Sequence, residues 1–272
     1  MILSTLRAAV VLLFLPLSLS FVALAPSPAN AGSARDAAIE NLVVANRVLA
    51  DQGVLDAFGH VSVRDPENPN HFLMSRNMPP ALVTKADIIE YDFDGKAINP
   101  PPKASDFLER FIHAEAYRAR PDVKAVVHSH SPAVIPFSVS KVPLQPLYHM
   151  AAFLSPSVPV FDIRQVAGMT NMLISNGKLG NALMKTLGDR NVVLMRGHGD
   201  VVVAGTLSMA VFRAVYTQTD ARLQLQAIDL GSPVTYLAPE ESAKAMAVLD
   251  KIHNRAWQLW KQAALAEMKE QR

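Results

Sequence analysis

The chain has 272 residues, of which 50% are hydrophobic and 18% are charged, a composition typical of a folded globular protein rather than a disordered one. Its formal net charge is only +2 and no run of lysine and arginine stands out, which argues against nucleic acid as a partner, because phosphate binding needs a concentrated basic surface. The sequence contains no cysteine, which excludes disulfide bonds and thiolate metal ligands.

The first 31 residues have the pattern of a secretory signal peptide. Arg7 precedes an apolar stretch over residues 8–25, and Ala29-Asn30-Ala31 is a small-residue cleavage pattern. We expect cleavage after Ala31 and an exported, periplasmic mature protein. An uncleaved membrane anchor is the alternative, since the apolar stretch is long for a signal core. No later apolar run is long enough to span a bilayer, so no membrane contact is expected after cleavage.

Periodicity in the remaining chain predicts alternating helices and strands. In chain order we expect a helix over 35–51, strands over 60–64, 71–75 and 88–93, a helix over 105–119 with Ser105 as N-cap, a strand over 123–127, a helix from about 131, a strand over 158–163, a helix over 170–187, strands over 191–195 and 201–204, and helices over 206–229 and 239–268. The composition shows no break along this series. We therefore predict a single α/β domain over residues 32–272.

Two histidines stand at the end of a predicted apolar strand. Because side chains two residues apart on a strand point to the same face, His128 and His130 can approach one ion together. Neutral imidazole is the commonest protein ligand for zinc, manganese and iron. The pattern by itself is equally compatible with a hydrogen-bonded histidine pair.

A further histidine lies between two glycines after another apolar strand. Gly197 and Gly199 permit a tight turn that presents His198 at a sheet edge, although a solvent-exposed turn histidine is the ordinary alternative. With His128 and His130 it would form an all-histidine site with open coordination positions, the type used in catalysis. Glu109 and His113 are four apart on a predicted helix, hence on one face. They are either an acid/base pair or part of a solvated helix surface.

Several of these segments, taken together and in order, resemble the class II aldolase/adducin family. The resemblance rests on residues 59–64 (GHVSVR), on Glu109 placed nineteen residues before His128, on the segment 128–130 and on the turn 197–199, and it covers nearly all of residues 36–230. It implies a three-layer α/β/α sandwich around a mostly antiparallel sheet. It also implies a homotetramer with the active site at a subunit interface. The three histidines would be the metal ligands, and Glu109 would match the family's catalytic or ligand glutamate.

Departures from the family's sugar-phosphate aldolases bear on the substrate. Those enzymes have Gly-Asn where this chain has Gly59-His60, a Thr/Ser-Gly turn where it has residues 75–80, and a serine pair where it has Phe107-Leu108. Losing these hydrogen-bond donors disfavours a phosphate and favours an apolar or aromatic substrate. The pattern is closer to the branch with hydroxypyridine-dicarboxylate and dihydroxyphthalate decarboxylases, which residues 109–113, 128–132 and 147–150 resemble.

We therefore predict a divalent-metal-dependent carbon–carbon lyase that decarboxylates a hydroxyaromatic or related hydroxy/oxo carboxylic acid through a metal-stabilised enolate. One ion per chain is expected, Zn²⁺ or Mn²⁺ before Fe²⁺ or Co²⁺. Glu109 is the predicted proton carrier, with His113 or His149 as alternatives. The competing predictions are an aldolase acting on a non-phosphorylated carbonyl compound, a non-haem iron oxygenase on the same scaffold, and a non-catalytic adducin-like interaction protein.

Three residues are candidates for binding the small-molecule substrate. Arg76 has a planar guanidinium that matches a carboxylate, although a surface loop residue is the more ordinary interpretation. His60 replaces the family's asparagine and would meet a carboxylate, or would be a buried, hydrogen-bonded histidine. Tyr148 would line the pocket, or would belong to the core with its hydroxyl satisfied.

Overall fold

Eight strands form one sheet in the computed structural model, which describes residues 33–98 and 100–270. The strands are β1 (His60–Arg64), β2 (His71–Ser75), β3 (Ile88–Asp92), β4 (Ala97–Ile98), β5 (Ala125–Ser129), β6 (Val160–Phe161), β7 (Val192–Met195) and β8 (Gly199–Ala204). Their order in the sheet is β4-β3-β2-β1-β5-β8-β7-β6. Every pair is antiparallel except β6 with β7, which is parallel. The expected mostly antiparallel sheet is confirmed.

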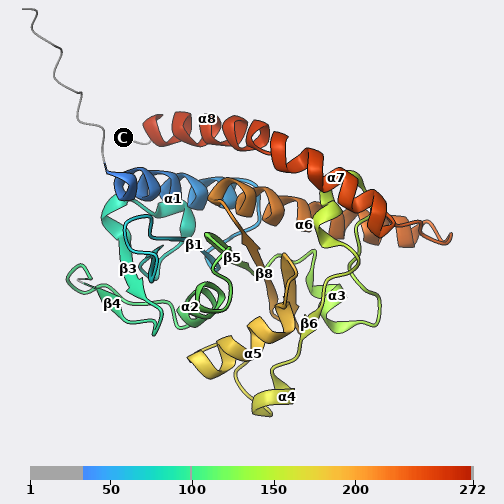
Figure 1. Ribbon diagram of the computed structural model, residues 1–272, viewed down its shortest axis with the longest axis horizontal. Coiled ribbons are helices and arrows are strands. Elements are labelled where there is room, and N and C mark those ends of the chain that lie inside the picture. The colour runs from blue at the N-terminus through green and yellow to red at the C-terminus, as the bar shows by residue number, and fades with distance from the viewer. Residues whose placement is uncertain (1–32, 99, 271–272) are drawn as a thin grey trace, which may run out of the picture. The chain divides into compact units, whose positions relative to one another are not determined.

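Helices cover both faces of this sheet (Figure 1). The helices are α1 (Ala34–Asp51), α2 (Arg110–Ala119), α3 (Ile135–Val139), α4 (Arg164–Ala167), α5 (Gly177–Leu187), α6 (Leu207–Asp229), α7 (Pro239–Ile252) and α8 (Asn254–Glu270), with 3₁₀ turns η1 (Pro80–Leu82), η2 (Lys85–Asp87) and η3 (His149–Leu154). α1, α6, α7 and α8 lie on one side of the sheet, and α2 and α5 lie on the other. The three-layer α/β/α architecture expected from the family resemblance is therefore correct.

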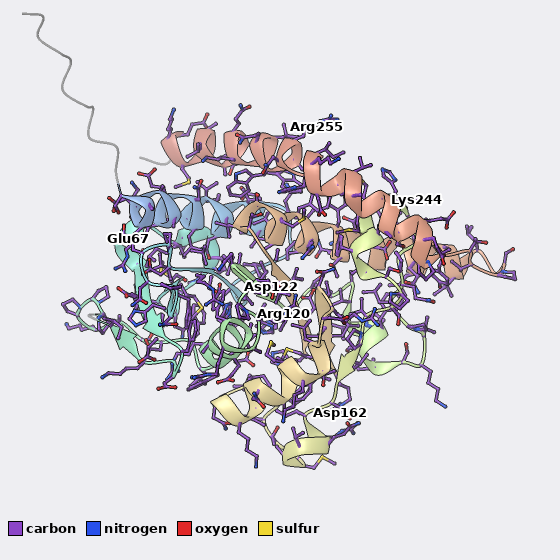
Figure 2. All side chains as sticks on the ribbon, in the orientation of Figure 1. Glu67, Arg120, Asp122, Asp162, Lys244 and Arg255 are labelled. Atoms are coloured by element: carbon purple, nitrogen blue, oxygen red, sulfur yellow. The ribbon has the colours of Figure 1, made fainter. Side chains whose placement is uncertain are left out.

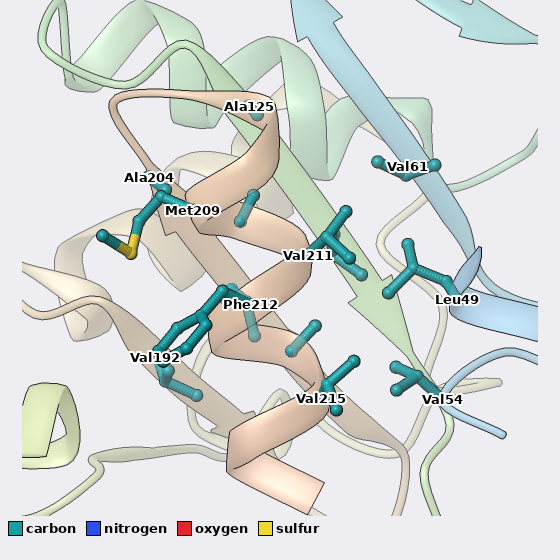
Figure 3. Packing of buried hydrophobic residues seen from close by; sticks show 14 of the residues in the cluster. Leu49, Val54, Val61, Ala125, Val192, Ala204, Met209, Val211, Phe212 and Val215 are labelled. Carbon is teal, nitrogen blue, oxygen red and sulfur yellow. The ribbon is translucent and has the colours of Figure 1, made fainter. Parts of the chain in front are cut away.

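Each face of the sheet has its own apolar core, because successive strand residues point to opposite sides. In β5, Val127 belongs to the core under α1 and α6, and Val126 belongs to the core under α2 and α5. Figure 3 shows the first core, where Phe212 and Val211 of α6 pack toward the strands. Burying such a side chain contributes roughly 1.5–3 kcal/mol, so the two cores fix the central strands firmly.

Helix boundaries differ from the sequence expectation in four places. The helix expected from about residue 131 is α3, which begins only at Ile135. The helix predicted over 105–119 begins only at Arg110, and Glu109 rather than Ser105 takes the N-cap position. The helix predicted over 170–187 begins at Gly177, because the side chain of Asn176 accepts the Leu179 N–H as an N-cap. The residues before it are irregular.

The last predicted helix, over 239–268, is in fact two helices that meet at His253. At this junction His253 Nε2 lies 3.2 Å from Ser208 Oγ at the start of α6.

The ion pair of Arg120 with Asp122 lies in the turn between α2 and β5 (Figure 2).

The predicted signal peptide lies outside the described residues. Among the helices of residues 33–98 and 100–270, none is long and apolar enough to cross a membrane.

Candidate metal centre

Three imidazole nitrogens converge at the end of β5 and the β7–β8 turn. His130 Nε2 lies 3.1 Å from His128 Nε2 and 3.1 Å from His198 Nε2. His128 is at the penultimate position of β5, His130 directly follows that strand, and His198 directly precedes β8. The antiparallel pairing of β5 with β8 joins Ser129 to Asp200 and brings these segments together. The sheet therefore assembles the predicted histidine triad.

Backbone carbonyls hold two of these rings with Nε2 toward the cluster. His128 Nδ1 donates to the Asp200 carbonyl at 2.9 Å, and His198 Nδ1 donates to the Met172 carbonyl at 3.2 Å. A ring that carries its proton on Nδ1 presents a lone pair at Nε2, and such second contacts orient metal-binding histidines generally. Converging lone pairs repel each other unless a cation lies between them. The donor set thus fits a divalent ion.

Glu109 completes the cluster from the N-cap position of α2. Its Oε2 lies 3.4 Å from both His128 Nε2 and His198 Nε2, and its Oε1 accepts the Ile174 N–H at 2.8 Å. The four candidate ligand atoms all lie within 4.8 Å of one another. Burial opposes ionisation of Glu109, but the contacts with His128 and His198 outweigh it and lower the pKa of this carboxyl group. Glu109 is therefore ionised, and its carboxylate can bind a metal ion or accept a proton at this point.

Two glycines let the strands approach closely at the centre. A Cβ on Gly199 would lie 1.9 Å from the Ser129 carbonyl oxygen, far inside contact distance. Gly59 has φ of +84°, and a Cβ there would lie 2.9 Å from the His128 carbonyl oxygen. Each glycine therefore permits the backbone separation that places the histidines.

A second polar group adjoins the triad beneath α2. His60 Nδ1 lies 2.6 Å from His113 Nε2, His113 Nδ1 lies 2.6 Å from Ser62 Oγ, and Ser62 Oγ lies 2.7 Å from the Tyr117 hydroxyl. The His60 ring is 5.1 Å from that of His128, centroid to centroid. Burial lowers the pKa of His113 to about 3, and burial together with neighbouring His113 and His128 lowers that of His60 well below its ordinary range. Both rings are therefore neutral at pH 7.

The other predicted site residues lie apart from the cluster. Arg76 is half-buried and pairs with Asp87, its Nε being 2.7 Å from Oδ1. Tyr148 packs near Tyr216 of α6, and its buried hydroxyl has no partner among the described residues. His149 is exposed and has a ring contact with Tyr148. The structure records no contact between these side chains and the four clustered ligand residues.

Sequence reasoning missed the groups that orient the ligands. Asp200, Met172 and Ile174 act through backbone atoms, which leave no residue signature. Met172 has φ of +69°, uncommon for a residue other than glycine, and such backbone often occurs at functional sites. Ser62 and Tyr117 had a detectable signal: Ser62 follows His60 by two on a strand, and Tyr117 follows His113 by four on a helix.

A family model described as the class II aldolase and adducin N-terminal domain matches residues 40–225. The chain belongs to this family. Decarboxylase tropJ of Talaromyces stipitatus is 36% identical to this chain over an alignment of 236 positions, which covers 78% of this chain and 88% of that protein. Another relative is the 3,4-dihydroxyphthalate decarboxylase of Arthrobacter keyseri, 32% identical over 80% of this chain and 88% of its own length.

Solved structures of the family have the same fold. The L-fuculose 1-phosphate aldolase of Glaciozyma antarctica superposes with a TM-score of 0.72 over 87% of this chain and 91% of that one, at 24% sequence identity. The decarboxylase names of the relatives agree with the branch of the family expected from the sequence. Metal dependence is a property of class II aldolases, and the His/Glu cluster described above is this chain's candidate site.

Proposed function

We propose that the protein is a divalent-metal-dependent carbon–carbon lyase that decarboxylates a hydroxyaromatic acid. The observation that supports it most directly is the convergence of three imidazole nitrogens and one carboxylate on a single point. The decarboxylase names of relatives 36% and 32% identical support the reaction type. His128, His130 and His198 would hold the ion, for which Zn²⁺ or Mn²⁺ are the preferred candidates. Bound there, it would act as a Lewis acid toward the charge that develops as the carbon–carbon bond breaks.

Glu109 is the proposed proton carrier. Decarboxylation replaces a carboxylate on the ring carbon by a hydrogen, so each turnover consumes one proton at that carbon. The Ile174 N–H holds Oε1 of Glu109, which fixes the carboxyl plane and leaves Oε2 directed at the cluster. His113 is fully buried with both ring nitrogens hydrogen-bonded, and His149 has no recorded contact with the cluster. Glu109 is thus the acid/base group best placed for the transfer.

Aromatic and apolar side chains beside the histidines favour an aromatic substrate. Phe107 packs on His60 with ring centroids 4.5 Å apart, and Phe58 lies 6.4 Å from His130 by the same measure. Phe58 and Leu108 are 66% and 60% exposed, so they offer open apolar surface next to the cluster. Such surface suits the face of a ring better than a phosphate dianion.

The test begins with metal analysis and a substrate panel. We expect about one Zn or Mn per chain in the purified mature protein. Incubation with hydroxyaromatic acids, including 3,4-dihydroxyphthalate, should release one CO₂ per substrate consumed, without O₂ uptake. Hydroxy-oxo acids serve as the comparison panel.

Three outcomes would contradict the proposal. Release of an aldehyde in place of CO₂ would indicate an aldolase. Iron-dependent O₂ consumption would indicate an oxygenase. Only traces of metal per chain would contradict both the decarboxylase and the aldolase assignments and would favour a non-catalytic role.

A further inference from the structure

A linear series of buried hydrogen bonds ends at His60, beside the candidate metal centre. It runs from the Tyr117 hydroxyl through Ser62 and His113 to Nδ1 of His60, over contacts of 2.6–2.7 Å. Ser62 and His113 have 0% exposure and Tyr117 has 1%, so the inner end has no contact with water. Because protons cannot enter or leave at that end, the chain is suited to orienting its members rather than conducting protons.

The direction of this chain follows from the Tyr117 hydroxyl. Among the described residues, Ser62 is the only side chain recorded as a hydrogen-bond partner of this hydroxyl. If Ser62 donated to Tyr117, the phenol proton would be buried without an acceptor, which is unfavourable. Tyr117 therefore donates to Ser62.

The remaining protons are then determined in sequence. Ser62 has accepted one hydrogen bond and donates its own proton to His113 Nδ1. His113 consequently carries its proton on Nε2 and donates it to His60 Nδ1. Because Nδ1 of His60 accepts this proton, the His60 ring carries its own proton on Nε2.

The Nε2 atom of His60 is the free end of this hydrogen-bond chain. His60 Nε2 has no hydrogen-bond partner among the described residues, yet it is not one of their buried unpaired polar atoms. It is therefore accessible, although His60 as a whole is only 3% exposed. The rings around it belong to His113, His128 and Phe107.

We propose that Tyr117, Ser62 and His113 lock His60 in the Nε2–H tautomer, so that it donates a hydrogen bond to a second carboxylate of the substrate. This inference rests on the proposed function for the substrate class. His60 is the residue that touches the substrate, and the other three are positioning residues. The arrangement selects aromatic acids with two carboxylates. One substrate carboxylate would bind the ion, and the other would accept a hydrogen bond from the fixed His60 N–H group.

Nitrogen-15 NMR of histidine-labelled, zinc-loaded protein tests the tautomer. The His60 signals are assigned by their loss in His60→Gln. We expect a protonated, pyrrole-type Nε2 and an unprotonated, pyridine-type Nδ1 between pH 6 and 8. A protonated Nδ1, or a doubly protonated ring, would overturn the proposal.

Binding of two probes tests the recognition. Phthalate has two neighbouring carboxylates and benzoate has one. We expect phthalate to bind more tightly than benzoate and to shift the His60 Nε2–H resonance downfield, whereas benzoate leaves it in place. Equal or weaker binding of phthalate, or an unmoved resonance in its complex, would contradict the second half of the inference.

Paired substitutions of His113 separate positioning from structural support. His113→Gln keeps an amide oxygen to accept from Ser62 and an amide N–H to donate to His60. His113→Leu keeps volume but neither group. We expect His113→Leu to raise KM about three- to tenfold, the effect of losing one ordered hydrogen bond, with a smaller change in kcat. His113→Gln should retain the wild-type KM within about twofold.

If both His113 variants changed KM equally, or if the changes in KM followed the changes in melting temperature, His113 would have only a structural role. The NMR and probe-binding experiments need no turnover, so they remain decisive if the lyase assignment fails. Conversely, if the protein catalyses decarboxylation but His60 has its proton on Nδ1, this inference is wrong and the proposed function is still supported.

Discussion

At the scale of single residues, the centre depends on side chains whose partners are fixed by neighbouring backbone. Glu109 illustrates this, since the Ile174 amide holds one carboxyl oxygen and the other faces the histidines. A residue in this position can transfer a proton without reorganising. A substitution that keeps the shape of the Glu109 side chain but removes its acid/base group can test the proposed role as proton carrier.

Glu109→Gln should lower kcat by about 10²–10⁴-fold, the usual contribution of a positioned acid/base group. Because the three histidines remain, the metal content should stay near that of wild type. Steady-state kinetics and metal analysis measure the two effects. Glu115→Gln, on the same helix but bonded to Arg118, is the matched control and should keep activity. A kcat for Glu109→Gln within threefold of wild type would remove Glu109 from the mechanism.

Asp220 gives a pH prediction remote from the centre. It is fully buried in α6, where Oδ1 accepts the Leu147 N–H at 2.9 Å and Oδ2 has no partner among the described residues. Burial raises its pKa to about 7. Since this exceeds the ordinary value of about 4 in an unfolded chain, the stabilisation from protonated Asp220 is complete below about pH 4 and is lost as the pH rises through 7.

Asp220→Asn should therefore raise the melting temperature more at pH 8.5 than at pH 5, because it removes the buried negative charge that forms at high pH. Thermal unfolding at both pH values measures the difference. Asp229→Asn, at the exposed end of the same helix, should give the same small change at both. A pH-independent effect of Asp220→Asn would show that this carboxyl group does not titrate as described.

At the scale of elements, the β5–β8 pair is the scaffold that joins the histidines. The pair is tight because Gly199 has no side chain to separate it from Ser129. Its geometry therefore links the stability of the sheet to the geometry of the metal centre.

Gly199→Ala should destabilise the protein by about 3 kcal/mol, the upper range for overpacking, because the contact is with rigid backbone. It should also weaken metal affinity in whatever folded protein remains. Gly205→Ala, just beyond the same strand, adds a Cβ whose nearest neighbour, the Asp122 carbonyl oxygen, is 3.7 Å away, and it should be close to neutral. Chemical denaturation measures both variants; similar curves would mean that β5 and β8 separate without cost.

At the scale of the whole molecule, the candidate ligands from the N-cap of α2, the end of β5 and the β7–β8 turn converge on one point, so metal binding there should stabilise the folded state of the domain. A ligand at one hundred times its Kd contributes about 2.7 kcal/mol, which for a domain of this size is about 5–10 °C in melting temperature. We expect chelation to lower the melting temperature by that amount and Zn²⁺ or Mn²⁺ to restore it.

His130→Ala should abolish this response, whereas His71→Gln should retain it, because His71 lies on β2 and pairs with Glu90 away from the cluster. A chelator that leaves the wild-type melting temperature unchanged would contradict a metal held by these ligands. Export, cleavage after Ala31 and a homotetramer remain predictions, to be checked by the mature N-terminus of the secreted protein and by its mass in solution.

The sequence by itself predicted seven of the eight described strands, the layer order through its family resemblance, and the three histidines with Glu109, because these depend on local periodicity and on spacing within motifs. The two-residue strand β4 was not predicted. Helix starts such as Arg110 and Gly177 were misplaced, since caps compete locally with helix propensity. Only the tertiary structure decided which backbone carbonyls orient His128 and His198, and that His60, Ser62, His113 and Tyr117 form one chain. Those contacts join residues that are far apart in the chain, and local sequence contains no record of which distant polar atom a buried side chain will meet.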